Sequence, residues 1–112
     1  MKRIITLIML TLILSAAVHA QLGGVKSIPG DYPSVASAIS AINADGIANG
    51  GVTFNVAAGY TETFTLPTDG RITTITSSAS NPIVFQKSGS GANPVITAAP
   101  GAGTTDAIIT FA

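Results

Sequence analysis

The stretch Asn81-Pro82-Ile83-Val84-Phe85 returns twelve residues later as Asn93-Pro94-Val95-Ile96-Thr97. Each copy leads into small, glycine-rich residues, at 88–91 and at 100–103. Fainter copies lie on either side, and one aliphatic residue recurs at the same phase of all of them: Ile72, Val84, Ile96 and Ile108. A fixed period of short apolar segments and turns is typical of stacked repeat folds, in which each unit needs neighbours to bury its apolar face.

The first twenty residues have the layout of a secretory signal peptide. Lys2 and Arg3 precede an apolar run from Ile4 to Leu14, and small residues follow before Gln21. The run is shorter than the roughly 20 residues of a membrane-spanning helix. We therefore expect a signal peptide over 1–20 that is cleaved, and a protein that is secreted or held at the cell surface.

The mature chain predicted by this cleavage is slightly acidic. It holds three basic and five acidic residues, with no cysteine and no histidine. A basic footprint for nucleic acid is missing, and neither a disulfide framework nor a thiolate metal site can form. Ser–His and Cys–His nucleophile pairs are excluded as well. No membrane span is expected after cleavage.

One helix is predicted near the start of the mature chain. Residues 21–30 form a lead-in segment that ends at a Pro-Gly turn. A helix is expected over 31–46, where either Asp31 or Ser34 suits the N-cap. Its apolar face collects aliphatic side chains at helical spacing: Val35, Ala38, Ile39 and Ile42. A helix this short needs an apolar surface to lie against.

From residue 51 onward the apolar residues follow a period of two. Val52, Phe54 and Val56 alternate with polar residues, as in a strand with one buried face. Further strands are expected at 63–66, 72–76, 83–86, 95–97 and 107–111. Loops of small residues join them in place of two-residue hairpin turns. This arrangement favours stacked parallel strands over a sandwich or barrel.

Two segments resemble the start of pectin-lyase-like proteins. The run Ile28-Pro29-Gly30-Asp31-Tyr32-Pro33-Ser34-Val35-Ala36-Ser37-Ala38-Ile39 resembles the segment that opens their short first helix. The run Gly51 to Glu62, which ends in Gly59-Tyr60-Thr61-Glu62, resembles the strand that begins their first coil. Residues 81–89 and 93–98 are similar to large exported surface proteins of Bacteroidetes-type bacteria, so a Gram-negative-type source is expected.

The resemblance implies an all-β fold with one capping helix, namely a right-handed parallel β-helix. Residues 51–112 would hold its first coils, each made of about two twelve-residue units. The apolar, charge-free segment 107–112 would be an aggregation hazard if left uncovered. We therefore expect a truncated β-helix that continues beyond Ala112 and whose isolated chain self-associates through its open strand edge.

No residue of the mature chain is predicted to be catalytic, to bind a cofactor or to hold a metal. The carboxylates are assigned to turns, caps or solvated surface: Asp31, Asp45, Glu62, Asp69 and Asp106. Residues 89–94 begin like a dinucleotide-binding fingerprint, but they lack its last glycine and the helix that should follow. Tyr32 and Tyr60 suit packing better than stacking on a sugar, and Arg71 and Lys87 are isolated cations.

Two functions are compatible with these sequence features. In the first, the chain is the non-catalytic cap and initial coils of a surface adhesin or polysaccharide-contacting protein, with polysaccharide bound by downstream coils. In the second, it begins a pectin-degrading lyase, esterase or hydrolase whose active site lies downstream. No residue of this chain indicates a particular enzymatic reaction.

Overall fold

The computed structural model describes residues 19–74, 76–98 and 108–112. These residues contain seven strands and one helix, joined by turns and loops. The helix and strands are, in chain order, β1 (Leu22–Ile28), α2 (Val35–Asp45), β2 (Ile47–Ala57), β3 (Thr61–Thr63), β4 (Arg71–Ile72), β5 (Ile83–Ser88), β6 (Val95–Thr97) and β7 (Thr110–Phe111). The signal peptide predicted over 1–20 falls almost entirely outside the described residues, as does part of the predicted strand 107–111. Within these ranges no helix is long and apolar enough to cross a membrane.

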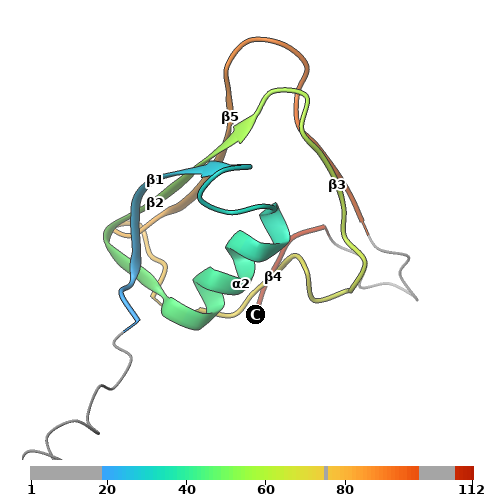
Figure 1. Cartoon of the computed structure of the whole chain (residues 1–112). Coiled ribbons are helices and arrows are strands. Elements are labelled where there is room, and N and C mark those ends of the chain that lie inside the picture. Colours follow the sequence, from blue (N-terminus) through green and yellow to red (C-terminus); the bar gives the residue numbers. More distant parts are fainter. Residues whose placement is uncertain (1–18, 75, 99–107) are drawn as a thin grey trace, which may run out of the picture.

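The strands form three small sheets, and every strand pair is parallel. One sheet has the order β1-β2-β5, the second pairs β3 with β6, and the third pairs β4 with β7. Consecutive strands after the helix therefore lie in different sheets, and the chain returns to the first sheet after visiting the other two (Figure 1). The prediction of parallel pairing without hairpins is confirmed.

The distance along the chain between paired strands is larger than predicted. Asn55 on β2 lies beside Gln86 on β5, 31 residues further along. From β3 to β6 the offset is 34 residues, and from β4 to β7 it is 39. The expectation of about two twelve-residue units per return is wrong, because roughly three units separate one strand from its partner.

The twelve-residue repeat thus runs from one sheet to the next instead of stacking within a sheet. Ile72 lies in β4, Val84 in β5 and Ile96 in β6. These residues share a phase because each marks one short strand followed by one turn. One side of the molecule in Figure 1, meaning one strand and the turn after it, therefore takes about one twelve-residue repeat of the sequence.

Helix α2 is shorter than the predicted range 31–46. Ser34 is its N-cap, and its Oγ accepts from the N–H of Ser37 at 3.0 Å while the Oγ of Ser37 accepts from the N–H of Ser34 at 3.1 Å. This reciprocal capping box satisfies two backbone donors at the helix start. Gly46 ends the helix, and its N–H donates to the carbonyl of Ile42 at 2.9 Å.

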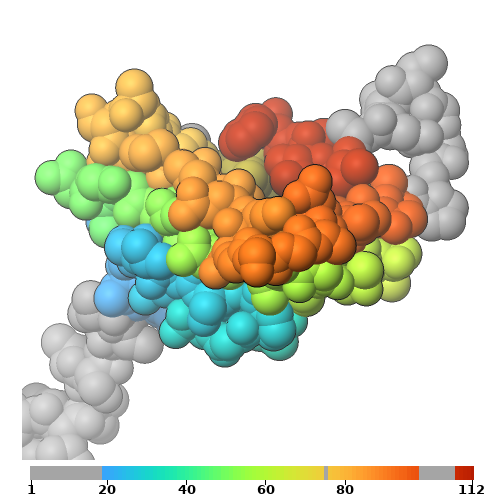
Figure 2. Space-filling model, turned by 90° about the horizontal axis from the view of Figure 1, so that it is seen from above, coloured from blue at the N-terminus to red at the C-terminus, as the bar shows by residue number. Residues whose placement is uncertain are grey.

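The aliphatic face of α2 is buried as predicted, and it is formed by Val35, Ala38, Ile39 and Ile42. Inward side chains of the strands and their connections complete the core: Leu22, Ile28, Ile47, Val52, Phe54, Val56, Phe64 and Ile72. In Figure 2, β1 and α2 (blue to cyan) form the lowest layer, with β2 and β3 above and β5 to β7 (orange to red) on top. The helix therefore covers one end of the layers.

Strand β1 corrects the prediction of a lead-in segment without strand over 21–30. It pairs with β2, with a bulge between Leu22 and Gly24, whose partners are Ile47 and Val52. Glycines and polar residues in β1 interrupt the alternation that makes β2 recognisable. Strand β1 therefore forms because β2 offers it backbone hydrogen-bond partners, and not because its own residues have a high strand propensity.

Two other strand boundaries differ from prediction, each for its own reason. Strand β3 ends at Thr63 rather than at residue 66, since the carboxylate of Asp69 accepts from the N–H groups of Thr65 and Leu66. Strand β2 begins at Ile47, before the glycines that were expected to precede it. A Cβ on Gly51 (φ +82°) would collide with the backbone of Pro82, so glycine permits this close approach.

Asn43, near the end of α2, fastens the helix to β4. Its Nδ2 donates to the carbonyl of Arg71 at 2.7 Å, and its Oδ1 accepts from the N–H of Thr73 at 2.8 Å. Both groups lie on the side of β4 away from β7, because it is Gly70 and Ile72 whose carbonyls accept from the N–H groups of Thr110 and Ala112. Asn43→Ala is expected to lower the free energy of unfolding by about 1–2 kcal/mol, measured by urea denaturation. Ser40→Ala, on the exposed face of the same helix, should change it by less than about 0.5 kcal/mol; equal losses in the two variants would contradict this role.

Candidate functional site

The carboxylates of Asp31 and Asp69 both accept from backbone groups in turns. A turn was predicted for Asp69, whereas Asp31 was expected to cap the helix, a role that Ser34 takes instead. Asp31 accepts from the N–H of Ser27 at 2.8 Å and from its hydroxyl at 3.0 Å. Asp69 accepts from the N–H groups of Thr65 and Leu66 at 2.8 and 2.9 Å. Both side chains close short turns that would otherwise leave donors without partners.

These hydrogen bonds lower the pKa of both carboxyls below the ordinary 3.8, chiefly through the N–H of Ser27 for Asp31 and of Leu66 for Asp69. A carboxyl with a lowered folded-state pKa stabilises the fold above its unfolded pKa, and this contribution is lost as the pH falls through the folded pKa.

The double variant Asp31→Asn, Asp69→Asn should therefore lose less stability than the parent on acidification below about pH 4. Urea midpoints measured across this range check it, and parallel pH profiles for parent and variant would contradict it.

Glu62 has a longer-range role than its predicted place in a turn, cap or solvated surface. Its carboxylate accepts from the N–H groups of Val35 at 2.7 Å and Ala36 at 3.1 Å, the first two residues of α2. The hydroxyl of Tyr60 donates to it at 2.8 Å. The segment 59–62, noted in the sequence as the end of a strand, thus binds the N-terminus of a helix that lies 27 residues earlier. Sequence reasoning did not identify this helix as its partner.

The remaining acids do not gather into a site. Asp45 Oδ1 lies 3.2 Å from Nδ1 of His19, and Asp106 falls outside the described residues. In the described part of the chain, no three His, Cys, Asp or Glu side chains come together as metal ligands would.

Three aromatic side chains form a column through the layers. The ring of Tyr32 meets that of Phe54 edge-on, with centroids 5.8 Å apart, and Phe54 stacks on Phe85 at 4.8 Å. Burial raises the pKa of Tyr32 and of Tyr60, and for Tyr60 the hydrogen bond to Glu62 adds to the effect. Both tyrosines pack against the core, which agrees with the predicted packing role.

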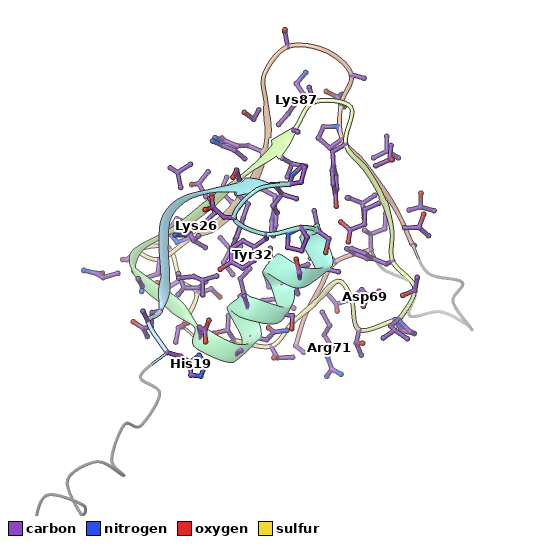
Figure 3. All side chains as sticks on the ribbon, viewed as in Figure 1. His19, Lys26, Tyr32, Asp69, Arg71 and Lys87 are labelled. Carbon is purple, nitrogen blue, oxygen red and sulfur yellow. The ribbon has the colours of Figure 1, made fainter. Side chains whose placement is uncertain are left out.

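The two isolated cations lie far apart. Figure 3 shows Lys87 at the corner beside the loop that joins β5 to β6, and Arg71 on the opposite side near Asp69. Lys87 Nζ donates to the carbonyl of Gly91 at 3.0 Å, across that loop. Residues 89–94 connect two strands, so the fingerprint-like run precedes no helix, as expected.

The hollows among the described residues include a polar one and an apolar one. The polar one of about 260 Å³ sits between α2 and the turn before β4, and is lined by Ala36, Ile39, Ser40, Asn43, Thr68 and Asp69. The apolar one of about 210 Å³ lies within the layers and is lined by Val35, Val56, Phe85, Pro94, Ile96 and Ile109, with Gln86 and Lys87 alongside. The apolar hollow adjoins the edge of the sheet at β5, and together they form the candidate site.

No protein-family model matches this chain, and no curated protein and no solved structure matches it either. The resemblance to pectin-lyase-like proteins therefore stays a prediction.

Proposed function

We propose that the chain is the N-terminal cap and the first coils of an exported right-handed parallel β-helix protein. It serves as a non-catalytic scaffold for a surface adhesin or polysaccharide-contacting protein. The observation that carries the proposal is the order of pairing, in which β2, β3 and β4 pair in parallel with β5, β6 and β7 in the same order. Successive units of a stacked fold repeat in this way.

Like side chains lie over like side chains between the layers, which supports the same proposal. Phe54 stacks on Phe85, and the Nε2 of Gln86 donates to the Oδ1 of Asn55 at 2.8 Å. Each pair occupies adjacent strands in register. When a fold repeats similar strands, similar side chains come to lie in columns, and each layer packs on the next through them.

Helix α2 supports the role of a cap. Its apolar face is buried under the layers, and its two ends are fixed to different strands, by Glu62 to β3 and by Asn43 to β4. A helix fastened in this way protects one end of a stack from pairing with other chains. The carboxylates of Asp31, Glu62 and Asp69 accept from backbone donors, which fits structural roles for these three acids.

Export is tested by expressing the full chain with a C-terminal tag in a Gram-negative host. We expect mass spectrometry of the purified product to give Gln21 as its first residue and fractionation to place it outside the inner membrane. A product in the cytoplasm that still begins at Met1 would overturn the export proposal.

The scaffold role is tested by incubating the folded chain with pectin and with homogalacturonan. We expect no unsaturated uronate product above the level given by the heat-denatured chain. Release of such products would overturn the scaffold role and favour the lyase alternative.

A further inference from the structure

Asp45 is an acidic residue at the end of α2, where a basic residue is normally favoured. The C-terminal end of a helix carries a partial negative charge, so a carboxylate there is destabilising unless a cation lies beside it. The last turn of α2 contains no basic residue. In the described part of the chain no lysine or arginine pairs with Asp45 either. A favourable environment for this carboxylate therefore depends on a cation from outside the helix.

The carboxylate of Asp45 is also largely withdrawn from water. Its side chain is 21% exposed, and its Oδ1 atom is buried. Within the described residues this oxygen accepts no hydrogen bond. A buried oxygen that has lost its hydrogen bonds to water destabilises the fold, the more so when it is charged. Asp45 thus differs from Asp31, Glu62 and Asp69, whose carboxylates accept from backbone donors.

The basic side chain that contacts this oxygen is that of His19. Its Nδ1 lies 3.2 Å from Oδ1 of Asp45, and the imidazole is 72% exposed. Figure 3 shows His19 beside the end of α2, where the chain enters β1. Cleavage before Gln21 would remove His19 together with the signal peptide. This partner of Asp45 therefore belongs to the precursor and not to the mature chain.

The same cleavage creates a new cation next to Asp45. Hydrolysis of the bond between Ala20 and Gln21 adds water across it, which leaves a carboxylate on Ala20 and an amino group on Gln21. At neutral pH an α-amino group is mostly protonated. The N–H of Leu22 donates to the carbonyl of Gly46 at 2.9 Å, and these two residues directly follow Gln21 and Asp45. Since one residue of extended chain spans about 3.3 Å, the new amino group lies within reach of the carboxylate.

We propose that the amino group of Gln21, once freed by signal cleavage, forms an ion pair with the buried carboxylate oxygen of Asp45. The pair fastens the start of β1 to the end of α2 and takes the place of the contact with His19. This inference rests on the proposed function, because only an exported and processed chain has this amino group. Removal of the signal peptide thus supplies a cation that stabilises the fold.

The test uses the processed chain, purified after export, before and after complete conversion by glutaminyl cyclase. This enzyme joins the amino nitrogen of Gln21 to its side-chain carbonyl carbon and releases ammonia, so the positive charge is lost while every other residue stays unchanged. We expect the cyclised chain to melt about 4–8 °C lower at neutral pH, measured by circular dichroism. In Asp45→Asn the free and cyclised forms should melt within about 1 °C of each other.

The rate of cyclisation provides a second measurement. The amino group attacks the side-chain amide only when it is unprotonated, and a neighbouring carboxylate favours the protonated form. Spontaneous cyclisation, followed by mass spectrometry as loss of ammonia, should therefore be about three- to ten-fold slower in the parent than in Asp45→Asn. Equal rates in the parent and this variant would contradict the ion pair.

Asp31→Asn is the matched control, because Asp31 lies beyond the opposite end of β1 and accepts from Ser27. This variant should keep both the melting difference and the slow cyclisation of the parent. Equal melting of the free and cyclised parent, which requires no substitution, would overturn the inference, as would a melting difference that persists in Asp45→Asn.

The proposed function fails by different results, namely an uncleaved product or released uronate. A processed chain that begins at Gln21 and melts alike in its free and cyclised forms would overturn this inference alone.

Discussion

Replacing Phe54 with alanine is expected to lower the free energy of unfolding by about 3–5 kcal/mol. Phe54 has no exposed surface, and its ring contacts those of Tyr32 and Phe85. Truncation would leave a cavity between two layers and remove both aromatic contacts, each worth about 0.5–1.5 kcal/mol. Because small domains have a total stability of only about 5–15 kcal/mol, the variant should lose most of its cooperative melting, measured by circular dichroism.

Phe111→Ala provides a matched control for this substitution. Its side chain is 74% exposed, so the same truncation should change the free energy of unfolding by less than about 0.5 kcal/mol. Phe54→Leu, which keeps most of the volume, should cost about 1–2 kcal/mol. If Phe54→Ala and Phe111→Ala melted alike, the column of rings would not be the core of the layers.

Glu62→Ala is expected to cost about 2–3 kcal/mol. The substitution leaves the N–H groups of Val35 and Ala36 and the hydroxyl of Tyr60 without their acceptor. It also removes a negative charge from the positive end of α2. Glu62→Gln keeps one acceptor oxygen in place but loses the charge, so about half of the loss should remain.

Urea denaturation and amide hydrogen exchange check this prediction together. Exchange at Val35 and Ala36 should accelerate in Glu62→Ala more than exchange in the middle of β2. Thr63→Ala, an exposed position of the same strand, should have little effect on either measurement. A loss of stability without faster exchange at the helix start would show that Glu62 acts elsewhere.

The sequence predicted the features that depend on neighbours along the chain. The buried face of α2 follows from helical spacing, and the strand around Phe54 follows from alternation with polar residues. The strand at 95–97 was predicted with the bounds that β6 has. In each case the residues that show the pattern are the ones that form the helix or strand, so the local sequence is sufficient to predict it.

The features that the sequence failed to predict depend on distant partners. Strand β1 has weak alternation and forms because β2 supplies its ladder. The link from Glu62 to the start of α2 joins residues whose spacing follows no local rule. The offset of 31 to 39 residues between paired strands was missed for the same reason, because the twelve-residue period measures one side of the fold and does not reveal how many sides precede a return.

Two corners of the chain differ in length although the strands that they join remain in register. Residues 58–60 connect β2 to β3, whereas 89–94 connect β5 to β6, yet β3 and β6 still pair in register. The ladder therefore tolerates extra chain at this corner, which extends away from the layers at the top of Figure 1. Evolution can lengthen or diversify such a loop without disturbing the sheets, and a protein engineer can graft a foreign epitope between Gly89 and Gly91 for display on a rigid support.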